Sequence, residues 1–232
     1  MLSGISAVAF DLDGTLYPNY SLNLRLLPFL FRHWRLMLAF RRARDIIRRE
    51  QAEQTAPGLP PPSSRPDFYE RQARLVADQL KAQKEEIRER LDRLIYRGWE
   101  PFFLKIKPFP HVKEFLGELK AAGIKLGLLS DFPPSIKLEY LGLSGFWDTA
   151  LCTESIGALK PAALPFEELA KALGCAPEQI LYVGNSSRYD VVGAKRTGMK
   201  AALLNTGFPV ITGIKADFTF RNYRQLRNYM LY

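Results

Sequence analysis

Short apolar segments alternate with amphipathic segments over the second half of the chain, after Pro108. Apolar runs with β-branched members indicate buried strands, and apolar positions at three- and four-residue spacing that stop at glycine indicate helices. The pattern predicts strands at 5–10, 124–130, 149–152, 179–183, 200–204 and 218–220, and helices at 111–122, 136–141, 165–173, 190–197 and 223–231. Strands that alternate with helices predict an α/β fold: a doubly wound parallel sheet with a Rossmann-like core.

Between the first strand and Pro108 the pattern is helical. Residues 22–50 and 67–97 are long stretches rich in Leu, Arg, Glu and Gln. The Pro-rich segment 56–66 between them cannot be helical and is expected to form a loop. We therefore predict an α/β core formed by residues 1–17 and 105–232, with a helical subdomain inserted at 18–104.

Positive charge is concentrated in this insert. The 232 residues carry a formal net charge of +9, and residues 16–107 hold 19 Lys and Arg against 11 Asp and Glu, a net charge of +8. Three interpretations stay open: a helix with solvated arginines, attraction of anionic phosphorylated substrates, and a helix that lies on anionic lipid. The first is favoured, peripheral membrane contact is the less favoured one, and nucleic-acid binding is not expected because no zinc-finger, RRM or KH signature is present.

Cysteine content and the N-terminal residues favour a cytoplasmic protein. Two cysteines, Cys152 and Cys175, are too few for a disulfide scaffold, and neither has a Cys or His at metal-ligand spacing. The first ten residues lack the basic start of a secretory signal, so none is expected. Charged residues interrupt the most apolar window, 22–40, which argues against a membrane-spanning helix. Nothing in the pattern indicates an oligomeric state.

Four polar motifs fall near the predicted ends of strands, where open parallel sheets bind their ligands. They are Asp11-Leu-Asp13-Gly-Thr15, Ser130-Asp131, Lys160-Pro161 and the segment from Gly184-Asn185 to Asp190. Taken singly, each also suits a turn, a helix cap or a solvated charge. Two carboxylates one residue apart repel each other, so Asp11 and Asp13 favour a nearby hard cation such as Mg²⁺ or a shared proton.

In this order the four motifs resemble those of the haloacid dehalogenase-like hydrolase superfamily. The resemblance covers residues 5–20 and 105–230, and it is closest to the phosphatase branch with a helical cap between the first two motifs. It implies a phosphoric monoester hydrolase that acts on a small phosphorylated substrate with Mg²⁺ as cofactor. Asp13 favours the phosphatases, because the family's dehalogenases lack this residue and its ion-pumping ATPases have Thr there.

The resemblance also implies a role for each matched residue. Asp11 would attack phosphorus and carry an aspartyl-phosphate, Asp13 would be the general acid and base, and Lys160 would neutralise negative charge in catalysis. The substrate phosphate would be bound by Thr15, Ser130, Asp131 and Lys160. The metal would be held by the Asp11 carboxylate, the Asp13 backbone carbonyl, Asn185 and Asp190.

Asn185 departs from the family pattern, because the phosphatases usually have Asp at this position. An amide oxygen can still bind Mg²⁺, but one negative charge is lost and the metal affinity should be weaker. The alternative function is therefore a non-catalytic binding or scaffold protein on the same fold. The motif residues would contact only the phosphoryl group and not the leaving group, so they do not indicate the physiological substrate.

Overall fold

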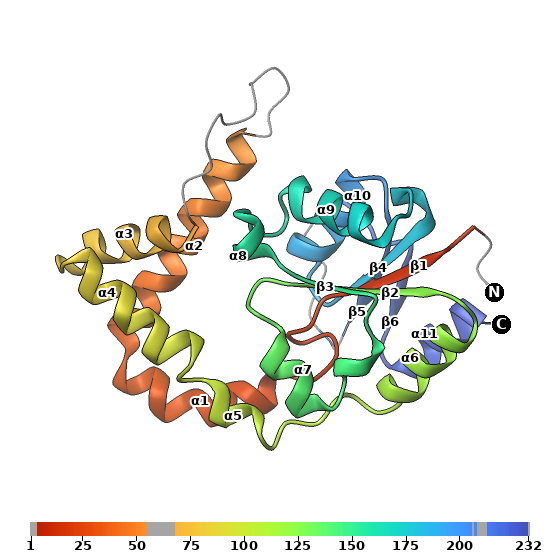
Figure 1. Ribbon diagram of the computed structural model, residues 1–232, viewed down its shortest axis with the longest axis horizontal. Coiled ribbons are helices and arrows are strands. Elements are labelled where there is room, and N and C mark those ends of the chain that lie inside the picture. The colour runs from red at the N-terminus through yellow and green to blue at the C-terminus, as the bar shows by residue number, and fades with distance from the viewer. Residues whose placement is uncertain (1–3, 55–67, 206, 208–212, 232) are drawn as a thin grey trace.

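The computed structural model describes residues 4–54, 68–205, 207 and 213–231 (Figure 1). The predicted Pro-rich loop at 56–66 lies outside these residues. Within them, an α/β core and a lobe of helices lie side by side, and the lobe is formed by the first helices of the chain (Figure 1).

The core contains a six-stranded sheet, and every neighbouring pair of strands is parallel. The strand order is β3 (Thr149–Cys152), β2 (Lys125–Ser130), β1 (Ala7–Phe10), β4 (Ile180–Gly184), β5 (Lys200–Leu204) and β6 (Phe218–Phe220). The chain first winds outwards from β1 to β3 and then continues on the other side of β1. The predicted doubly wound sheet is confirmed, and its switch point lies beside β1.

Helices cover both faces of the sheet because strand side chains alternate between the faces. Val8 and Phe10 lie in the apolar cluster on one face, and Ala7 and Ala9 lie in the cluster on the other. The first face is covered by α6 (Val112–Ala121), α7 (Ser135–Leu141) and α11 (Tyr223–Leu231), and the second by α9 (Ala163–Leu173) and α10 (Val192–Arg196) (Figure 1). The remaining short turns of the core are η2 (Ser144–Phe146), α8 (Thr153–Ile156), η3 (Pro177–Gln179) and the π-helical turn η4 (Ser187–Val191).

In the helical lobe, each of the two long helical stretches predicted from the sequence is divided into several helices. Its elements are α1 (Asn19–Arg32), α2 (Trp34–Gln54), α3 (Phe68–Leu80), α4 (Lys84–Leu91), the π-helical turn η1 (Asp92–Tyr96) and α5 (Glu100–Phe103). The first stretch bends at His33, so that α1 packs Leu26 against the main core while α2 packs Leu36 into a separate lobe core. The second stretch is interrupted near Lys81, whose φ of 53° is left-handed. Both predicted stretches are helical, but each is divided into shorter helices, and in the first the division lets α1 and α2 join different apolar clusters.

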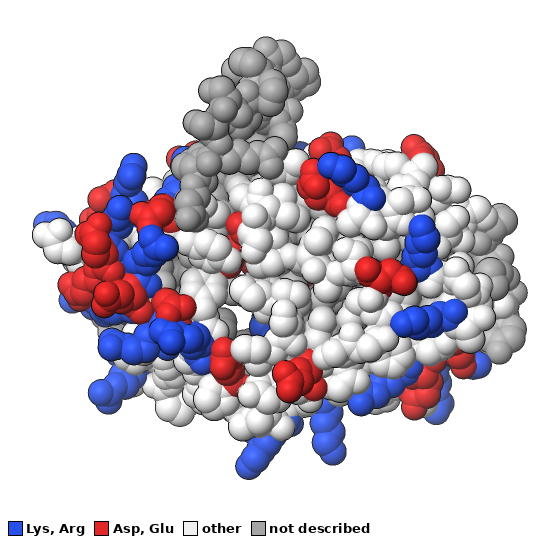
Figure 2. All heavy atoms as spheres, in the orientation of Figure 1, with Lys and Arg blue, Asp and Glu red and all other residues white. Residues whose placement is uncertain are grey.

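Charged side chains crowd over the outer end of the lobe, where α3 and α4 lie, and are sparser over the core helices on the same face (Figure 2). Glu70, for example, pairs with both Lys84 and Arg88. Exposed pairs of this kind each contribute at most about 1 kcal/mol to stability. None of the helices in the described residues combines the length and the apolar character that crossing a membrane requires.

Candidate active site

A tight turn after β1 brings two carboxylates to one cleft. The Asp11 N–H still bonds to the Val183 carbonyl at 2.9 Å, in register with the sheet, and the chain then turns through Gly14 at φ 87°. A Cβ at Gly14 would lie only 2.0 Å from Nδ2 of Asn185, so no other residue fits this turn without a shift. Asp11 and Asp13 consequently line the same cleft, which has a volume of about 1020 Å³.

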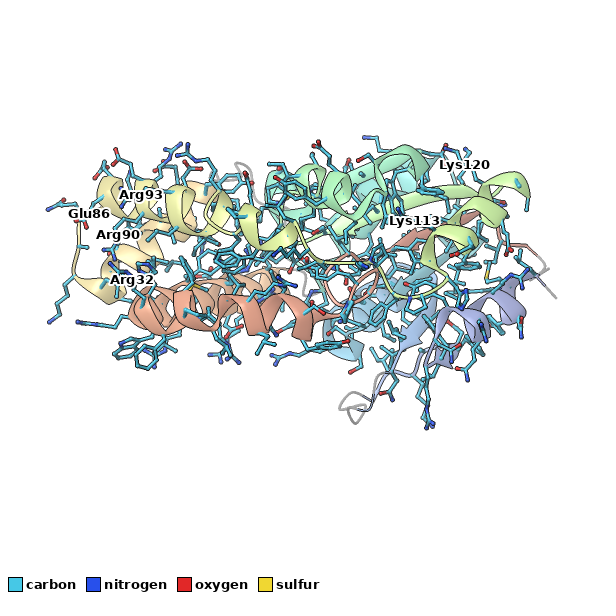
Figure 3. All side chains as sticks on the ribbon, turned by 90° about the horizontal axis from the view of Figure 1, so that it is seen from below. Arg32, Glu86, Arg90, Arg93, Lys113 and Lys120 are labelled. Atoms are coloured by element: carbon cyan, nitrogen blue, oxygen red, sulfur yellow. The ribbon has the colours of Figure 1, made fainter. Side chains whose placement is uncertain are left out.

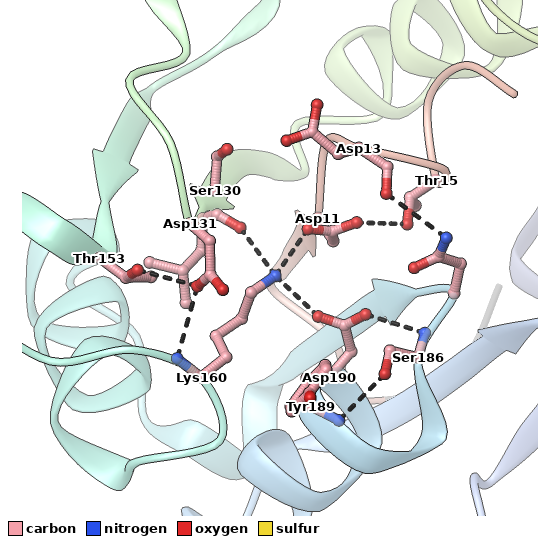
Figure 4. A network of polar contacts seen from close by, with 12 residues as sticks. Asp11, Asp13, Thr15, Ser130, Asp131, Thr153, Lys160, Ser186, Tyr189 and Asp190 are labelled. Atoms are coloured by element: carbon pink, nitrogen blue, oxygen red, sulfur yellow. Dashed lines mark hydrogen bonds and ion pairs between the residues drawn. The ribbon is translucent and has the colours of Figure 1, made fainter. Parts of the chain in front are cut away.

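Lys160 joins two of the predicted acidic residues. Its Nζ lies 2.6 Å from Oδ1 of Asp11 and 2.7 Å from Oδ1 of Asp190, and it also donates to the Leu129 carbonyl at 3.3 Å (Figure 4). All three charged side chains are buried. The first, third and fourth motifs therefore meet in one contact, at the carboxyl ends of β1 and β4.

Burial makes the charges of this contact depend on one another. It raises the pKa of Asp11 to about 7 against the opposing attraction of Lys160, and the nearby Asp190 and Asp13 add to the rise. Burial by itself would lower the pKa of Lys160, but Asp11 and Asp190 raise it well above its ordinary value. The ammonium therefore stays protonated, and a further cation at the site would favour the ionised form of Asp11.

Thr15 lies in the turn after β1 and Ser130 is the last residue of β2, and both are fully buried. Oγ1 of Thr15 donates to Oδ2 of Asp11 at 2.7 Å, so both oxygens of that carboxylate have a hydrogen-bond partner. The backbone of Thr15 is held in turn by the Tyr223 hydroxyl, which donates to its carbonyl at 2.7 Å. Oγ of Ser130 accepts from the Phe132 N–H at 3.2 Å, which fixes the loop after β2.

Asp13 is held by a lysine that the sequence analysis missed. Nζ of Lys137, in α7, lies 2.7 Å from both carboxylate oxygens of Asp13, and the Tyr17 hydroxyl donates to Oδ1. Lys137 is buried although it is charged. One signal was available: the residue lies one turn before Leu141, on the apolar face of the predicted helix at 136–141, where an unpaired lysine would not be expected.

The fourth motif supplies a carboxylate and an amide. Oδ2 of Asp190 accepts from the Ser186 N–H at 3.0 Å, which orients the side chain towards Lys160. Nδ2 of Asn185 lies 3.4 Å from the carbonyl oxygen of Asp13. Both residues line the cleft together with Asp11, so the structure brings the four predicted metal ligands to one place.

These four residues offer oxygen donors that suit Mg²⁺. Among the described residues, no group of three or more His, Cys, Asp or Glu side chains is arranged to hold a metal alone. The predicted set differs because two of its donors are neutral, the Asp13 carbonyl and the Asn185 amide. Carboxylate, carbonyl and amide oxygens are hard ligands that fit Mg²⁺. Binding by Asn185 would require its amide to rotate, because its NH₂ group faces the Asp13 carbonyl.

Asp131 contacts the helical lobe. Its Oδ2 accepts from Nη2 of Arg48 at 2.8 Å and lies 3.5 Å from Nη2 of Arg44, while its Oδ1 accepts from Thr153 at 2.8 Å. Burial would raise the pKa of Asp131, but Lys160, Arg44 and Arg48 lower it to about 2. The ionised carboxylate thereby links α2 to the core beside Lys160.

The contact between α2 and the core corrects the interpretation of the insert's arginines as solvated for two residues, Arg44 and Arg48. Arg44 is only 5% exposed and pairs with the buried Glu154 of α8. Arg48 donates to the Lys160 carbonyl at 3.1 Å and lies over the Tyr189 ring at 4.5 Å. These two arginines face the core because α2 runs along it, whereas the other arginines of α1 and α2 are exposed.

A family model of haloacid dehalogenase-like hydrolases matches residues 5–198, a range that includes all four motifs. The chain belongs to this family. The predicted superfamily and the prediction of a hydrolase are confirmed. The match begins just before β1 and spans the helical lobe as well as the four motifs, and it ends before α11, which carries Tyr223.

Relatives of this haloacid dehalogenase-like hydrolase include two curated phosphatases. The chain is 36% identical over 107 residues to glyceraldehyde 3-phosphate phosphatase of Methanothermobacter thermautotrophicus, which covers 45% of the chain and 47% of that protein, so the chain spans about half the length of this relative. It is 29% identical over 225 residues to phosphoglycolate phosphatase of Escherichia coli (strain K12), covering 88% and 82%. A solved structure of a phosphatase of this family from Thermococcus onnurineus has a TM-score of 0.62 at 22% identity over 97% of each chain, a likeness of fold.

Proposed function

We propose that this haloacid dehalogenase-like hydrolase is a Mg²⁺-dependent phosphatase that cleaves a small phosphate monoester through an aspartyl-phosphate on Asp11. The observation that carries the proposal is the buried contact of Lys160 with Asp11 and Asp190, beside Asp13 at the end of β1. The named phosphatases among its relatives support the same chemistry.

Asp11 is the proposed nucleophile. Its carboxylate oxygen forms a bond to phosphorus while the bond from phosphorus to the substrate's ester oxygen breaks, and Asp13 gives the departing oxygen a proton. Asp13 then takes a proton from a water molecule that attacks the same phosphorus. The acyl phosphate bond breaks, inorganic phosphate leaves and Asp11 is restored as a carboxylate.

Charge explains the proposed need for a metal. With Asp13 protonated for its role as the acid, the charges of Asp11 and Asp190 cancel those of Lys160 and Lys137, so the side chains leave no net positive charge to attract a phosphate dianion. The dianion and the Asp11 carboxylate also repel each other at contact. Asp11, the Asp13 carbonyl, Asn185 and Asp190 would hold Mg²⁺, which supplies the missing positive charge and polarises the phosphoryl oxygens. Lys160 shares this task, and Thr15 and Ser130 would donate hydrogen bonds to the phosphoryl group.

The helical lobe is proposed to be the cap that contacts the leaving group. We retain the division into a core of residues 1–17 and 105–232 and a cap of 18–104. The cleft extends from Asp11 to Tyr20 and Asn23 of α1, so cap residues line its outer part. The contacts of Arg48 with Asp131 and with the Lys160 carbonyl tie cap position to the catalytic residues. We place the enzyme in the cytoplasm, where both cysteines, free in this structure, would stay reduced.

A metal requirement is the first expected result. The protein should hydrolyse an activated phosphate monoester and at least one member of a panel of sugar phosphates, phosphorylated small acids and nucleotides. Excess chelator should abolish hydrolysis, because no metal cation then balances the negative charges of the substrate phosphate and the Asp11 carboxylate. Steady-state phosphate release measures it. Full activity in chelator contradicts the metal role. No hydrolysis of any substrate with Mg²⁺ present favours the alternative, a non-catalytic binding protein with a weakened metal site.

Asn185→Asp tests the metal ligands directly. The added carboxylate should lower the Mg²⁺ concentration for half-maximal rate on the order of tenfold, because a charged ligand replaces a neutral one. Asn205→Asp is the matched control, since it adds the same charge to another residue that lines the cleft. An equal effect of both variants, or no effect of Asn185→Asp, would show that this side chain does not contact the ion.

A further inference from the structure

Helix α1 has a second apolar face that is exposed to solvent, and its first residue, Tyr20, also lines the outer end of the cleft. Tyr20, Leu24, Leu27 and Phe31 recur on α1 at spacings of four, three and four residues, and Trp34, just beyond the bend at His33, is a fifth exposed apolar residue. Each of the five is more than half exposed, and Phe31 is 87% exposed. We call these five residues the outer stripe. Single exposed apolar residues are ordinary, but an aligned series on one helix marks an interaction surface.

The stripe is not the face that α1 uses for folding. Leu22 and Leu26 are buried in the main apolar cluster. At about 100° of rotation per residue, these two lie on the opposite side of the helix from Leu24 and Phe31. Apolar residues therefore lie on both sides of α1, but only one side is buried against the protein and the other is exposed to solvent.

Arginines without acidic neighbours in sequence border the outer stripe. Arg25 and Arg32 lie on α1 and Arg35 follows Trp34, and the chain has no Asp or Glu between Asp13 and Asp45. All three arginines are exposed, and among the described residues none takes part in an ion pair. Arg32 lies at the outer end of the lobe, where Arg93, Arg90 and the partner of Arg90, Glu86, also lie (Figure 3). Limited burial, together with the positive charges of Arg32 and Arg90, lowers the pKa of His33.

We propose that the outer stripe and its arginines dock this protein on an anionic lipid surface. The apolar and aromatic side chains would enter the boundary between headgroups and acyl chains, and the arginines would meet the lipid phosphates. A second copy of this chain is a poorer occupant, since two such faces would bring Arg25, Arg32 and Arg35 of both copies together and repel. Lipid docking requires no catalysis, so this proposal is independent of the proposed phosphatase activity.

Vesicle binding of the full chain tests the proposal. At low salt the protein should sediment with vesicles of phosphatidylcholine and phosphatidylglycerol and stay in solution with phosphatidylcholine alone. The triple variant Arg25→Gln, Arg32→Gln, Arg35→Gln should bind anionic vesicles more weakly, on the order of 100-fold. Each arginine near an anionic surface contributes roughly a factor of five to the binding constant. Phe31→Ser combined with Trp34→Ser should reduce the bound fraction at least tenfold, since these exposed rings supply the apolar contact.

Tyr140→Ser, on the partly exposed side of α7, is the matched control and should bind as the parent does. Circular dichroism checks that every variant is folded. Absence of binding to anionic vesicles at low salt overturns the proposal, as does equal binding to neutral ones. A dimer in solution that Phe31→Ser dissociates also overturns it, because the stripe would then serve a second copy of the chain.

Discussion

Asp11→Asn is expected to lower phosphate turnover by a factor on the order of 10⁴ or more while the fold survives. An amide is a poor nucleophile towards phosphorus, and the change also removes the negative charge that Lys160 and the proposed metal ion share. Steady-state phosphate release measures the loss. The melting temperature should change little, because Asn has nearly the shape of Asp and Lys160 keeps Asp190 as its partner.

Asp78→Asn is the control for this change, since it makes the same substitution at an exposed residue of α3. It should leave the rate unchanged. Turnover by Asp11→Asn at more than a few per cent of the parent rate would show that Asp11 is not the nucleophile. A direct attack by water, guided by Asp13, would then be the better mechanism.

Lys160→Met is expected to cause the largest loss of stability, about 3–5 kcal/mol in the free energy of unfolding at pH 8 with chelator present. The substitution leaves Asp11 and Asp190 buried next to each other with no compensating charge. Burial already raises the pKa of Asp11 to about 7, and loss of the ammonium raises it further. The folded variant therefore binds more protons than the unfolded chain between pH 5 and 8, so its stability should fall as pH rises through this range.

Urea unfolding of parent and variant at pH 5 and pH 8 measures this pH dependence, and the difference between the proteins should be smaller at pH 5. Lys171→Met, at an exposed position of α9, is the control and should change the unfolding free energy by less than about 0.5 kcal/mol. Lys160→Met combined with Asp190→Asn should recover part of the loss. A difference between parent and variant that is the same at both pH values would contradict the assigned charge coupling.

The sheet could be predicted from the sequence because its signals are local. Each strand is a short apolar run bounded by turn residues, and the helix-closing glycines, Gly174 for example, mark the connections. The bend at His33 could not be predicted in this way. It exists because α1 and α2 serve two different apolar clusters, and a pattern of apolar positions does not say which cluster a helix will join.

The candidate site was predictable where the interacting residues lie in one short motif, as do the carboxylates of Asp11 and Asp13. Lys137 was missed because its partner, Asp13, lies 124 positions away, so that only the tertiary fold reveals the contact. The contacts of Arg44 with Glu154 and of Arg48 with Asp131 were missed for the same reason. Charges on a helix suggest solvent exposure by default, and only the fold shows that α2 turns these two arginines towards the core.

The stereochemical outcome at phosphorus tests the covalent mechanism most directly. The substrate would be a monoester made chiral with oxygen isotopes and sulfur, hydrolysed in isotopically labelled water, and the configuration of the product would be read by phosphorus NMR. Attack by Asp11 followed by attack of water on the phosphoryl enzyme comprises two in-line displacements, each with inversion, so the two-step mechanism predicts net retention. Net inversion would show a single displacement by water and contradict an aspartyl-phosphate on Asp11.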